Sequence, residues 1–212
     1  MNRSTTASLS RSTAPVRAET TVALQDRGAL RPALGLGVAS LLGFGLLYAV
    51  ATTGVTGALF QDPAQGSLLV QDGQVRGSRL VAQPFAADGY FQSRPSAAGY
   101  DPMAAAGSNM ARTHPDLQAR VKEATAAVAT REGVAVADVP ADLVTQSGGG
   151  LDPHLSPAAA AVQVARVARA RGMTVAQVQA VVDAHTEGRT WGVFGQPRVN
   201  VLMLNVALDA TP

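Results

Sequence analysis

The chain has 212 residues, with 17 lysines and arginines against 15 acidic residues and no cysteine. The absence of cysteine excludes disulfides and thiolate metal sites. Only 4% of the residues are aromatic, and basic residues dominate only ahead of residue 32, so a nucleic-acid-binding surface is not expected.

Residues 1–31 are rich in Ser, Thr and Arg and show no apolar periodicity. Such a segment cannot bury enough apolar surface to offset the entropy of ordering it, so we expect a disordered tail. Its five arginines face only Glu19 and Asp26, and the first basic residue after residue 61 is Arg76. The positive-inside rule therefore predicts a cytoplasmic tail and an extracytoplasmic location for the residues after 61.

Residues 32–61 carry no charged side chain. A membrane-spanning helix needs about 20 apolar residues, each rising about 1.5 Å. The stretch therefore predicts a single transmembrane helix from about Leu34 to Leu59. A cleaved signal peptide is the alternative, because Ala49-Val50-Ala51 resembles a cleavage site, although the apolar region is longer than usual and follows a long tail.

Inside this helix, Gly35, Ala39 and Gly43 recur every fourth residue, which places small side chains along one face. Small residues let two helices approach closely in lipid, so the stripe predicts a helix-packing surface in the membrane. The alternative explanation is that glycine is simply frequent in membrane helices.

Residues 62–212 are numerous enough for one domain with its own core. Their patterns predict an α+β fold with a short β-hairpin or sheet and about three to four helices. Residues 67–71 and 74–77 flank Asp72-Gly73, a strong hairpin signal. Residues 78–85 are expected to add a third strand, and residues 88–113 a long ordered loop or lid.

Helices are expected in the second half of the domain, each with start and stop signals. Residues 199–208 fit a strand as well as a helix capped by Asn200, of which we favour the helix. The other predicted helices are 115–130 (cap at Thr113 or His114, stop at Gly133), 157–171 (Ser156 cap, Pro157 first, stop at Gly172) and 175–186 (capping box Thr174 and Gln177, stop at Gly188).

The residue patterns of common enzymes are missing. Lys122 is the only lysine and follows no glycine-rich loop, so the chain has no P-loop. His114, His154 and His185 form no close pair, so no metal site is expected, and His185 is interpreted as a partly buried structural residue. There is no nucleophile elbow either, so no catalytic residue is assigned.

Two further features carry charge or could bind it. The run Ser147–Gly150 could direct backbone N–H groups at an anion, or could be a flexible turn between a strand and a helix. Arg166 and Arg169 are expected to form a basic edge that is only solvated.

Short motifs follow one another in a fixed order from residue 30 to the end of the chain. They include Leu30-Arg31-Pro32-Ala33-Leu34, Gly66-Ser67-Leu68-Leu69, Val75-Arg76-Gly77-Ser78, Gly89-Tyr90-Phe91, Arg94-Pro95-Ser96-Ala97, Gly107-Ser108-Asn109, VPADLVT at 139–145, Gly150-Leu151-Asp152-Pro153-His154, RVARAR at 166–171, His185-Thr186 and PRVNV at 197–201. In this order they resemble KdpC, a subunit family of the bacterial Kdp potassium-transporting ATPase. The chain departs from the family at Tyr48-Ala49, where Tyr-Pro is common, and at Thr113-His114-Pro115, where Ser-Asn-Pro is common.

The resemblance implies an accessory subunit of an ATP-driven potassium uptake complex in the bacterial inner membrane. The implied partners are a channel-like potassium-translocating subunit, a P-type ATPase subunit, a small helical subunit and the lipid bilayer. No covalently bound cofactor is implied, and potassium is handled by the complex. The family is described as a catalytic chaperone that raises the ATP affinity of the ATPase subunit, which implies a nucleotide site at Ser147, Gly148, Gly149 and Gly150.

The charge pattern and this description disagree, because ATP is cytoplasmic and the domain is predicted to lie outside. We therefore expect a non-catalytic subunit that stabilises assembly and caps the potassium-translocating subunit on the outer face. The ATP-binding chaperone is the alternative. A lone anchored enzyme of the cell envelope is a third hypothesis, against which the lack of a paired nucleophile and base argues.

Overall fold

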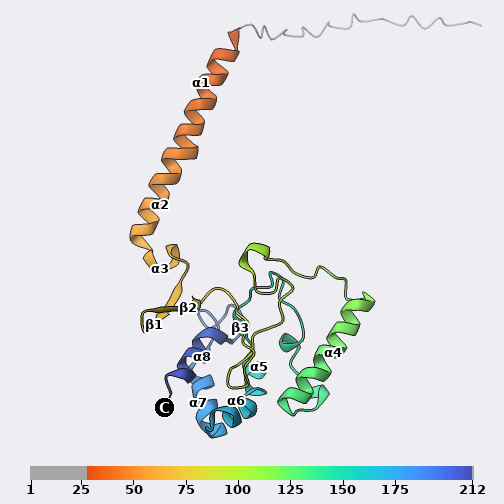
Figure 1. Cartoon of the computed structure of the whole chain (residues 1–212). Helices are drawn as coiled ribbons and strands as arrows, with labels where there is room; N and C mark the ends of the chain where they lie inside the picture. Colours follow the sequence, from red (N-terminus) through yellow and green to blue (C-terminus); the bar gives the residue numbers. More distant parts are fainter. Residues whose placement is uncertain (1–27, 212) are drawn as a thin grey trace, which may run out of the picture. The chain divides into compact units, whose positions relative to one another are not determined.

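The computed structural model describes residues 28–211, so the predicted tail, 1–31, lies almost wholly outside the described residues. The chain divides between Val55 and Thr56 into two compact units, which are considered separately. Figure 1 shows a long helix in the first part of the described chain and a mixed helical and β domain in the second.

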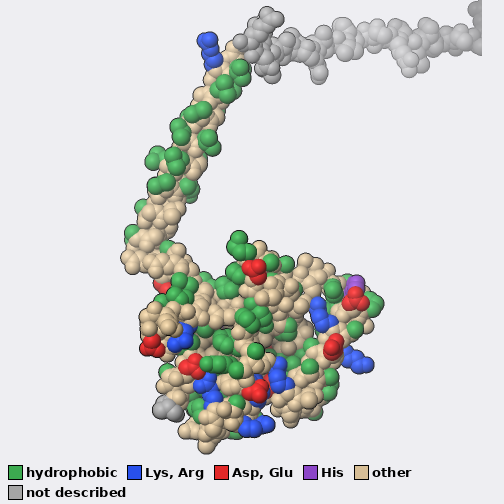
Figure 2. Space-filling model, in the orientation of Figure 1, with side chains coloured by type: hydrophobic (Ala, Val, Ile, Leu, Met, Phe, Trp, Pro, Cys, Tyr) green, Lys and Arg blue, Asp and Glu red, His purple; other side chains and the backbone are tan. Residues whose placement is uncertain are grey.

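The apolar helix is continuous from Leu30 to Leu59, and its 30 residues correspond to about 45 Å at 1.5 Å per residue. It consists of α1 (Leu30–Ser40), the π-helical segment η2 (Leu41–Leu47) and α2 (Tyr48–Leu59). Apolar side chains are spread along the helix in Figure 2, and none of its apolar window is buried. By length and composition the helix can cross a membrane, as the sequence predicts.

The β-hairpin forms as predicted. After the short helix α3 (Gln61–Ala64), strand β1 (Leu68–Gln71) pairs with the antiparallel strand β2 (Gln74–Ser78). Asp72 and Gly73 both have positive φ, 52° and 73°, which a tight two-residue hairpin turn requires.

The predicted third strand at 78–85 is wrong, because residues after Ser78 leave the hairpin and run as irregular chain. The backbone N–H of Ala82 donates to the carbonyl of Leu151 at 3.0 Å, and Pro84 has no N–H to give to a sheet. The long loop expected at 88–113 is confirmed, with only the short helix η3 (Pro102–Ala104) inside it.

The first domain helix, α4 (Pro115–Glu132), begins and ends as predicted. The Nδ1 atom of His114 accepts from the backbone N–H of Asp116 at 3.2 Å, and Gly133 ends the helix with φ 70°. Two single turns follow, η4 (Val136–Asp138) and η5 (Ala141–Leu143).

The helix predicted from 157 to 171 is two helices, α5 (Pro157–Ala161) and α6 (Val164–Arg171). The caps at Ser156 and Gly172 are as predicted, but Gln163 interrupts the helix. Its side-chain amide donates to the carbonyl of Ala159 at 3.1 Å, the group that its backbone N–H would bind in a continuous helix. That backbone N–H binds Ala160 instead, one residue closer.

The last elements form a small antiparallel sheet and two helices. The strand order is β3 (His154–Leu155), β5 (Arg198–Asn200) and β4 (Thr186–Glu187). Helix α7 (Val175–Ala184) has the predicted capping box but ends before Thr186, which is in β4. Asn200 ends β5 and caps α8 (Val201–Asp209). Of the predicted segment 199–208, the first two residues therefore belong to the strand and the rest form the helix that we favour.

The core lies between this sheet and the helices. Helices α6, α7 and α8 lie side by side, and one face of the sheet closes over them through Leu155 and Val199. Phe91, from the long loop, is fully buried in the same core, so the loop is part of the packed domain. The α+β fold class predicted from the sequence is confirmed.

Candidate functional site

The Ser147–Gly150 run lies in an irregular segment between η5 and β3. Ser147 is buried, and its hydroxyl accepts from the backbone N–H of Asp152 at 3.4 Å. The N–H of Gly150 donates to the carbonyl of Ser147 at 3.2 Å. Only Gly148 and Gly149 are exposed, so the two ends of the run are held by contacts within the loop.

Gly150 has a packing role of its own. Its φ of 71° is in the left-handed region, and an added Cβ would lie 2.8 Å from the carbonyl oxygen of Ala106 and 3.0 Å from the Cβ of Ala98. The hydroxyl of Ser96 donates to the Gly150 carbonyl at 2.6 Å. A Cβ at Gly107 would likewise lie 2.6 Å from the carbonyl oxygen of Gly148. The glycine-rich run is therefore packed closely against the long loop.

Next to this run, Asp152 forms a small charged cluster. Its carboxylate lies 2.9 Å from Nη1 of Arg94 and 3.4 Å from Nδ1 of His154. The pKa of Asp152 is lowered, and the largest cause is the hydrogen bond with the His154 side chain. Burial raises this pKa, but the backbone N–H of His154 and the charge of Arg94 lower it further. Burial raises the pKa of Tyr100, whose hydroxyl donates to the Arg94 carbonyl at 2.9 Å.

Two cavities flank the sheet on the side of His154 and Arg198, and both residues line both cavities. Their volumes are about 380 and 430 Å³. A third, of about 490 Å³, lies along α4 and includes Lys122. None of the three is lined by Ser147 or the glycines after it. Within residues 28–211 no group of three potential metal-ligating side chains is found.

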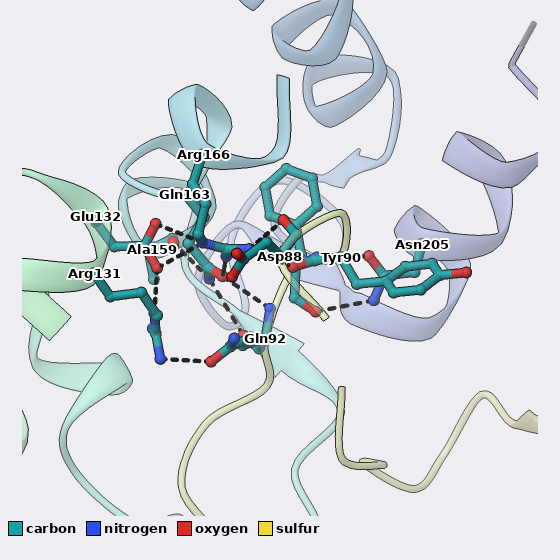
Figure 3. A network of polar contacts seen from close by, with 10 residues as sticks. Asp88, Tyr90, Gln92, Arg131, Glu132, Ala159, Gln163, Arg166 and Asn205 are labelled. Carbon is teal, nitrogen blue, oxygen red and sulfur yellow. Dashed lines mark hydrogen bonds and ion pairs between the residues drawn. The ribbon is translucent and has the colours of Figure 1, made fainter. Parts of the chain in front are cut away.

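The most extensive polar network is buried around Arg166 (Figure 3). Arg166 is only 6% exposed, and its Nε lies 3.0 Å from Oε2 of Glu132. The other carboxylate oxygen of Glu132, Oε1, lies 2.7 Å from Nε of Arg131. The same guanidinium donates to the carbonyls of Asp88 and Tyr90 at 2.6 and 2.9 Å. The predicted solvated edge is therefore wrong for Arg166, whereas Arg169 is exposed.

Two side-chain amides complete the network by each holding one residue of the long loop. Asn205 accepts from the N–H of Phe91 at 2.8 Å and donates to its carbonyl at 2.9 Å. The Gln163 amide likewise accepts from the backbone N–H of Gln92 at 2.8 Å and donates to the Gln92 carbonyl at 3.2 Å. These contacts replace the hydrogen bonds of a sheet, so residues 88–92 are fixed to α6 and α8 without forming a strand.

The small-residue stripe lies in α1 and η2. Gly35 and Ala39 are exposed and Gly43 is partly exposed. Cβ atoms added at Gly35 or Gly43 would meet nothing within 4 Å. His185, the expected structural histidine, is partly buried, with Nδ1 2.8 Å from the carbonyl oxygen of Val181.

An apolar loop between β4 and β5 was not singled out from the sequence. Trp191, Val193 and Phe194 are 87%, 69% and 61% exposed. Thr190 and Phe194 bind each other through both backbone hydrogen bonds, and the two aromatic rings meet edge to face at 6.0 Å. The run TWGVFG, apolar and punctuated by two glycines, was the available sequence signal.

The described elements define a chain with one candidate membrane-spanning helix followed by one α+β domain. The family model described as KdpC, the c chain of the K⁺-transporting ATPase, matches residues 30–210, and the chain belongs to this family. It is 57% identical over 190 residues to the potassium-transporting ATPase KdpC subunit of Xanthomonas campestris pv. campestris strain B100, covering 90% of this chain and 91% of that protein.

Two other relatives carry the same description. The protein of Xanthomonas oryzae pv. oryzae is 58% identical over 186 residues, covering 88% of this chain and 89% of the relative. That of Shewanella putrefaciens is 51% identical over 165 residues, covering 78% and 83%. The family expected from the motifs is confirmed.

Proposed function

We propose that the chain is a non-catalytic accessory subunit that stabilises a potassium-transporting ATPase complex and caps its potassium-translocating subunit on the outer face. The observation that carries this proposal is the use of the buried polar groups. The buried side chains of the network bind backbone groups of the same domain or one another; they are Arg166, Glu132, Gln163 and Asn205. The network therefore fixes the conformation of the domain, and these groups are not directed at a substrate.

The loop at Trp191 supports a role in assembly. Large exposed aromatic side chains that are fixed in one conformation are typical anchors of protein interfaces, because little side-chain entropy is lost when they are buried. The two backbone hydrogen bonds between Thr190 and Phe194 fix the backbone of the loop, and the Trp191 and Phe194 rings contact each other. We assign this loop to contact with the potassium-translocating subunit.

The stripe at Gly35, Ala39 and Gly43 supports docking inside the bilayer. A helix of another subunit could approach closely there, because the surface above Gly35 and Gly43 is open. The partners at this face are one or more of the channel-like, P-type and small helical subunits.

The outer location is supported by the charge asymmetry around the apolar helix. ATP binding at Ser147–Gly150 remains the second candidate, since the exposed Gly148 and Gly149 leave a stretch of backbone that an anion can reach. Saturable binding of labelled ATP to the purified chain, abolished by Gly149→Val, would support it.

The assembly proposal is tested by purification of the complex through a tag on another subunit. Replacing Trp191 and Phe194 by serine should reduce the amount of this chain that is recovered, without changing its melting temperature. Val175→Ser, at a position that is 56% exposed elsewhere on the domain, is the control and should be recovered in full. Full recovery of the Trp191/Phe194 variant would refute the assigned contact.

A further inference from the structure

The β1–β2 hairpin is apolar on the face that it exposes. Val70 pairs with Val75 next to a register shift in the hairpin, and along β1 Leu68 and Val70 are exposed whereas Leu69 and Gln71 are half-buried. The side chains of Val70, Val75 and Leu68 therefore lie on the exposed side. They are 57%, 60% and 43% exposed. Antiparallel sheets with one solvated face usually place polar residues there. We call Leu68, Val70 and Val75 the exposed hairpin face.

The opposite side of the hairpin packs on the domain. Gly77 pairs with Leu69, and a Cβ at Gly77 would overlap the side-chain amide of Gln83. That amide donates to the carbonyl of Arg76 at 3.0 Å. The hairpin is therefore fixed through one side, and two strands alone are marginally stable in water, so a covering layer on the exposed hairpin face would stabilise it.

The chain holds this hairpin close to the end of the apolar helix. The backbone N–H of Ser67 donates to the carbonyl of Asp62 at 2.8 Å, and Asp62 is three residues beyond Leu59. Three extended residues and this hydrogen bond therefore keep the start of strand β1, at Leu68, within roughly 20 Å of the helix end. Since the headgroup layer extends roughly 5–8 Å beyond the hydrocarbon core, a helix that crosses the bilayer carries the hairpin to its surface.

The charges around the hairpin do not oppose contact with lipid. Arg79 pairs with Asp62, and Arg76 lies 4.0 Å from Asp72. These two arginines and two aspartates sum to zero, so this part of the chain carries no net negative charge toward the phosphates of the headgroup layer.

We propose that the exposed hairpin face lies in the headgroup layer of the bilayer that the chain's own helix crosses. The short connection keeps the hairpin near lipid in every molecule whose helix crosses the bilayer, whether or not other subunits are bound, which favours lipid over a protein as the occupant. The proposal rests on the helix crossing the membrane and is independent of any contact at Trp191.

The absence of cysteine allows single labels in the full chain. A bimane fluorophore is attached at Val75→Cys in vesicles of brominated lipid, with Leu46→Cys as the label inside the helix and Val175→Cys as the matched exposed control. Bromine should quench the Val75 label and the Leu46 label, and leave the Val175 label accessible to aqueous iodide.

Three outcomes would overturn the proposal. A Val75 label that iodide reaches as readily as the Val175 label shows a face in water. A Val75 label that is shielded from both quenchers only after the other subunits are added shows a protein occupant. Lack of bromine quenching at Leu46 shows that the helix does not cross the bilayer, which removes the premise and is distinguishable from the other two.

Discussion

Replacing Arg166 by methionine should destabilise the domain strongly, because it leaves Glu132 buried with less compensation. The Glu132 side chain is 0% exposed and that of Arg166 is 6% exposed. Removing one partner of a buried pair costs about 3–5 kcal/mol. Arg131 remains 2.7 Å from Glu132, so we expect a loss at the lower end of this range, about 3 kcal/mol. The carbonyls of Asp88 and Tyr90 also lose a hydrogen-bond donor, which adds to the destabilisation.

Such a loss is a large part of the stability of an ordinary domain, which is about 5–15 kcal/mol. At about 2–4 °C per kcal/mol, it should lower the melting temperature of the full chain by roughly 10 °C. Circular dichroism of the chain in detergent, recorded during heating and in urea, measures both quantities, since the domain helices α4–α8 dominate the signal that changes.

Arg169→Met is the matched control, three residues later on the same helix and exposed. Its effect should stay within the range of surface substitutions, about 0.5 kcal/mol. A double variant, Arg166→Met with Glu132→Leu, should recover part of the loss, because neither charge is then left buried. If the Arg166 and Arg169 variants unfold at the same temperature, the buried pair does not hold the domain together as we infer.

Three other predictions follow from single positions. Gly150→Ala should destabilise the domain by about 1–3 kcal/mol, because of its left-handed φ and the contact with Ala106, whereas Gly149→Ala should be neutral; equal melting temperatures would contradict this. The pKa of Asp152 is lowered below its ordinary 3.8, so the ionised carboxylate stabilises the folded domain above pH 3.8, and this stabilisation is lost as the pH falls further. The unfolding free energies of the wild type and of Asp152→Asn should therefore converge below pH 3.8. A difference that stays constant down to the lowest pH would contradict this prediction. Gly35→Leu should reduce copurification with other subunits, while Gly37→Leu, on the opposite side of α1 and equally open, should not; identical recovery would exclude docking through the stripe.

The elements that the sequence predicts well are those with local signals. The Asp72-Gly73 turn and the Thr174–Gln177 capping box each depend on residues a few positions apart, and both form as expected. The end of α4 at Gly133 depends only on the left-handed conformation that glycine adopts without strain.

The errors arise where a distant partner decides the outcome. Arg166 looks like a surface residue on its helix, but its partner Glu132 is 34 residues away. Gln163 interrupts a good helical pattern because its amide binds Ala159 and the backbone of Gln92. A polar Asn205 inside the apolar run of 199–208 was a visible signal for such a contact, although it could not indicate Phe91 as the partner.

The candidate nucleotide run shows the same limit. Its glycines could be identified from the sequence, but the structural need for glycine differs between positions. Gly150 is required by its left-handed φ and by close packing, whereas a Cβ at Gly149 would meet no atom within 4 Å. A motif of this composition therefore predicts a tight backbone approach without deciding whether the approaching group is a ligand or the long loop of the same domain.

The central claim, a subunit that acts on the outer face, is tested most directly by protease accessibility in oriented vesicles that contain the assembled complex. In right-side-out vesicles, digestion should remove a C-terminal tag and the domain beyond about Phe60, and in inverted vesicles the same tag should be protected. Protection in right-side-out vesicles with digestion in inverted ones would contradict the claim and place Ser147–Gly150 beside cellular ATP.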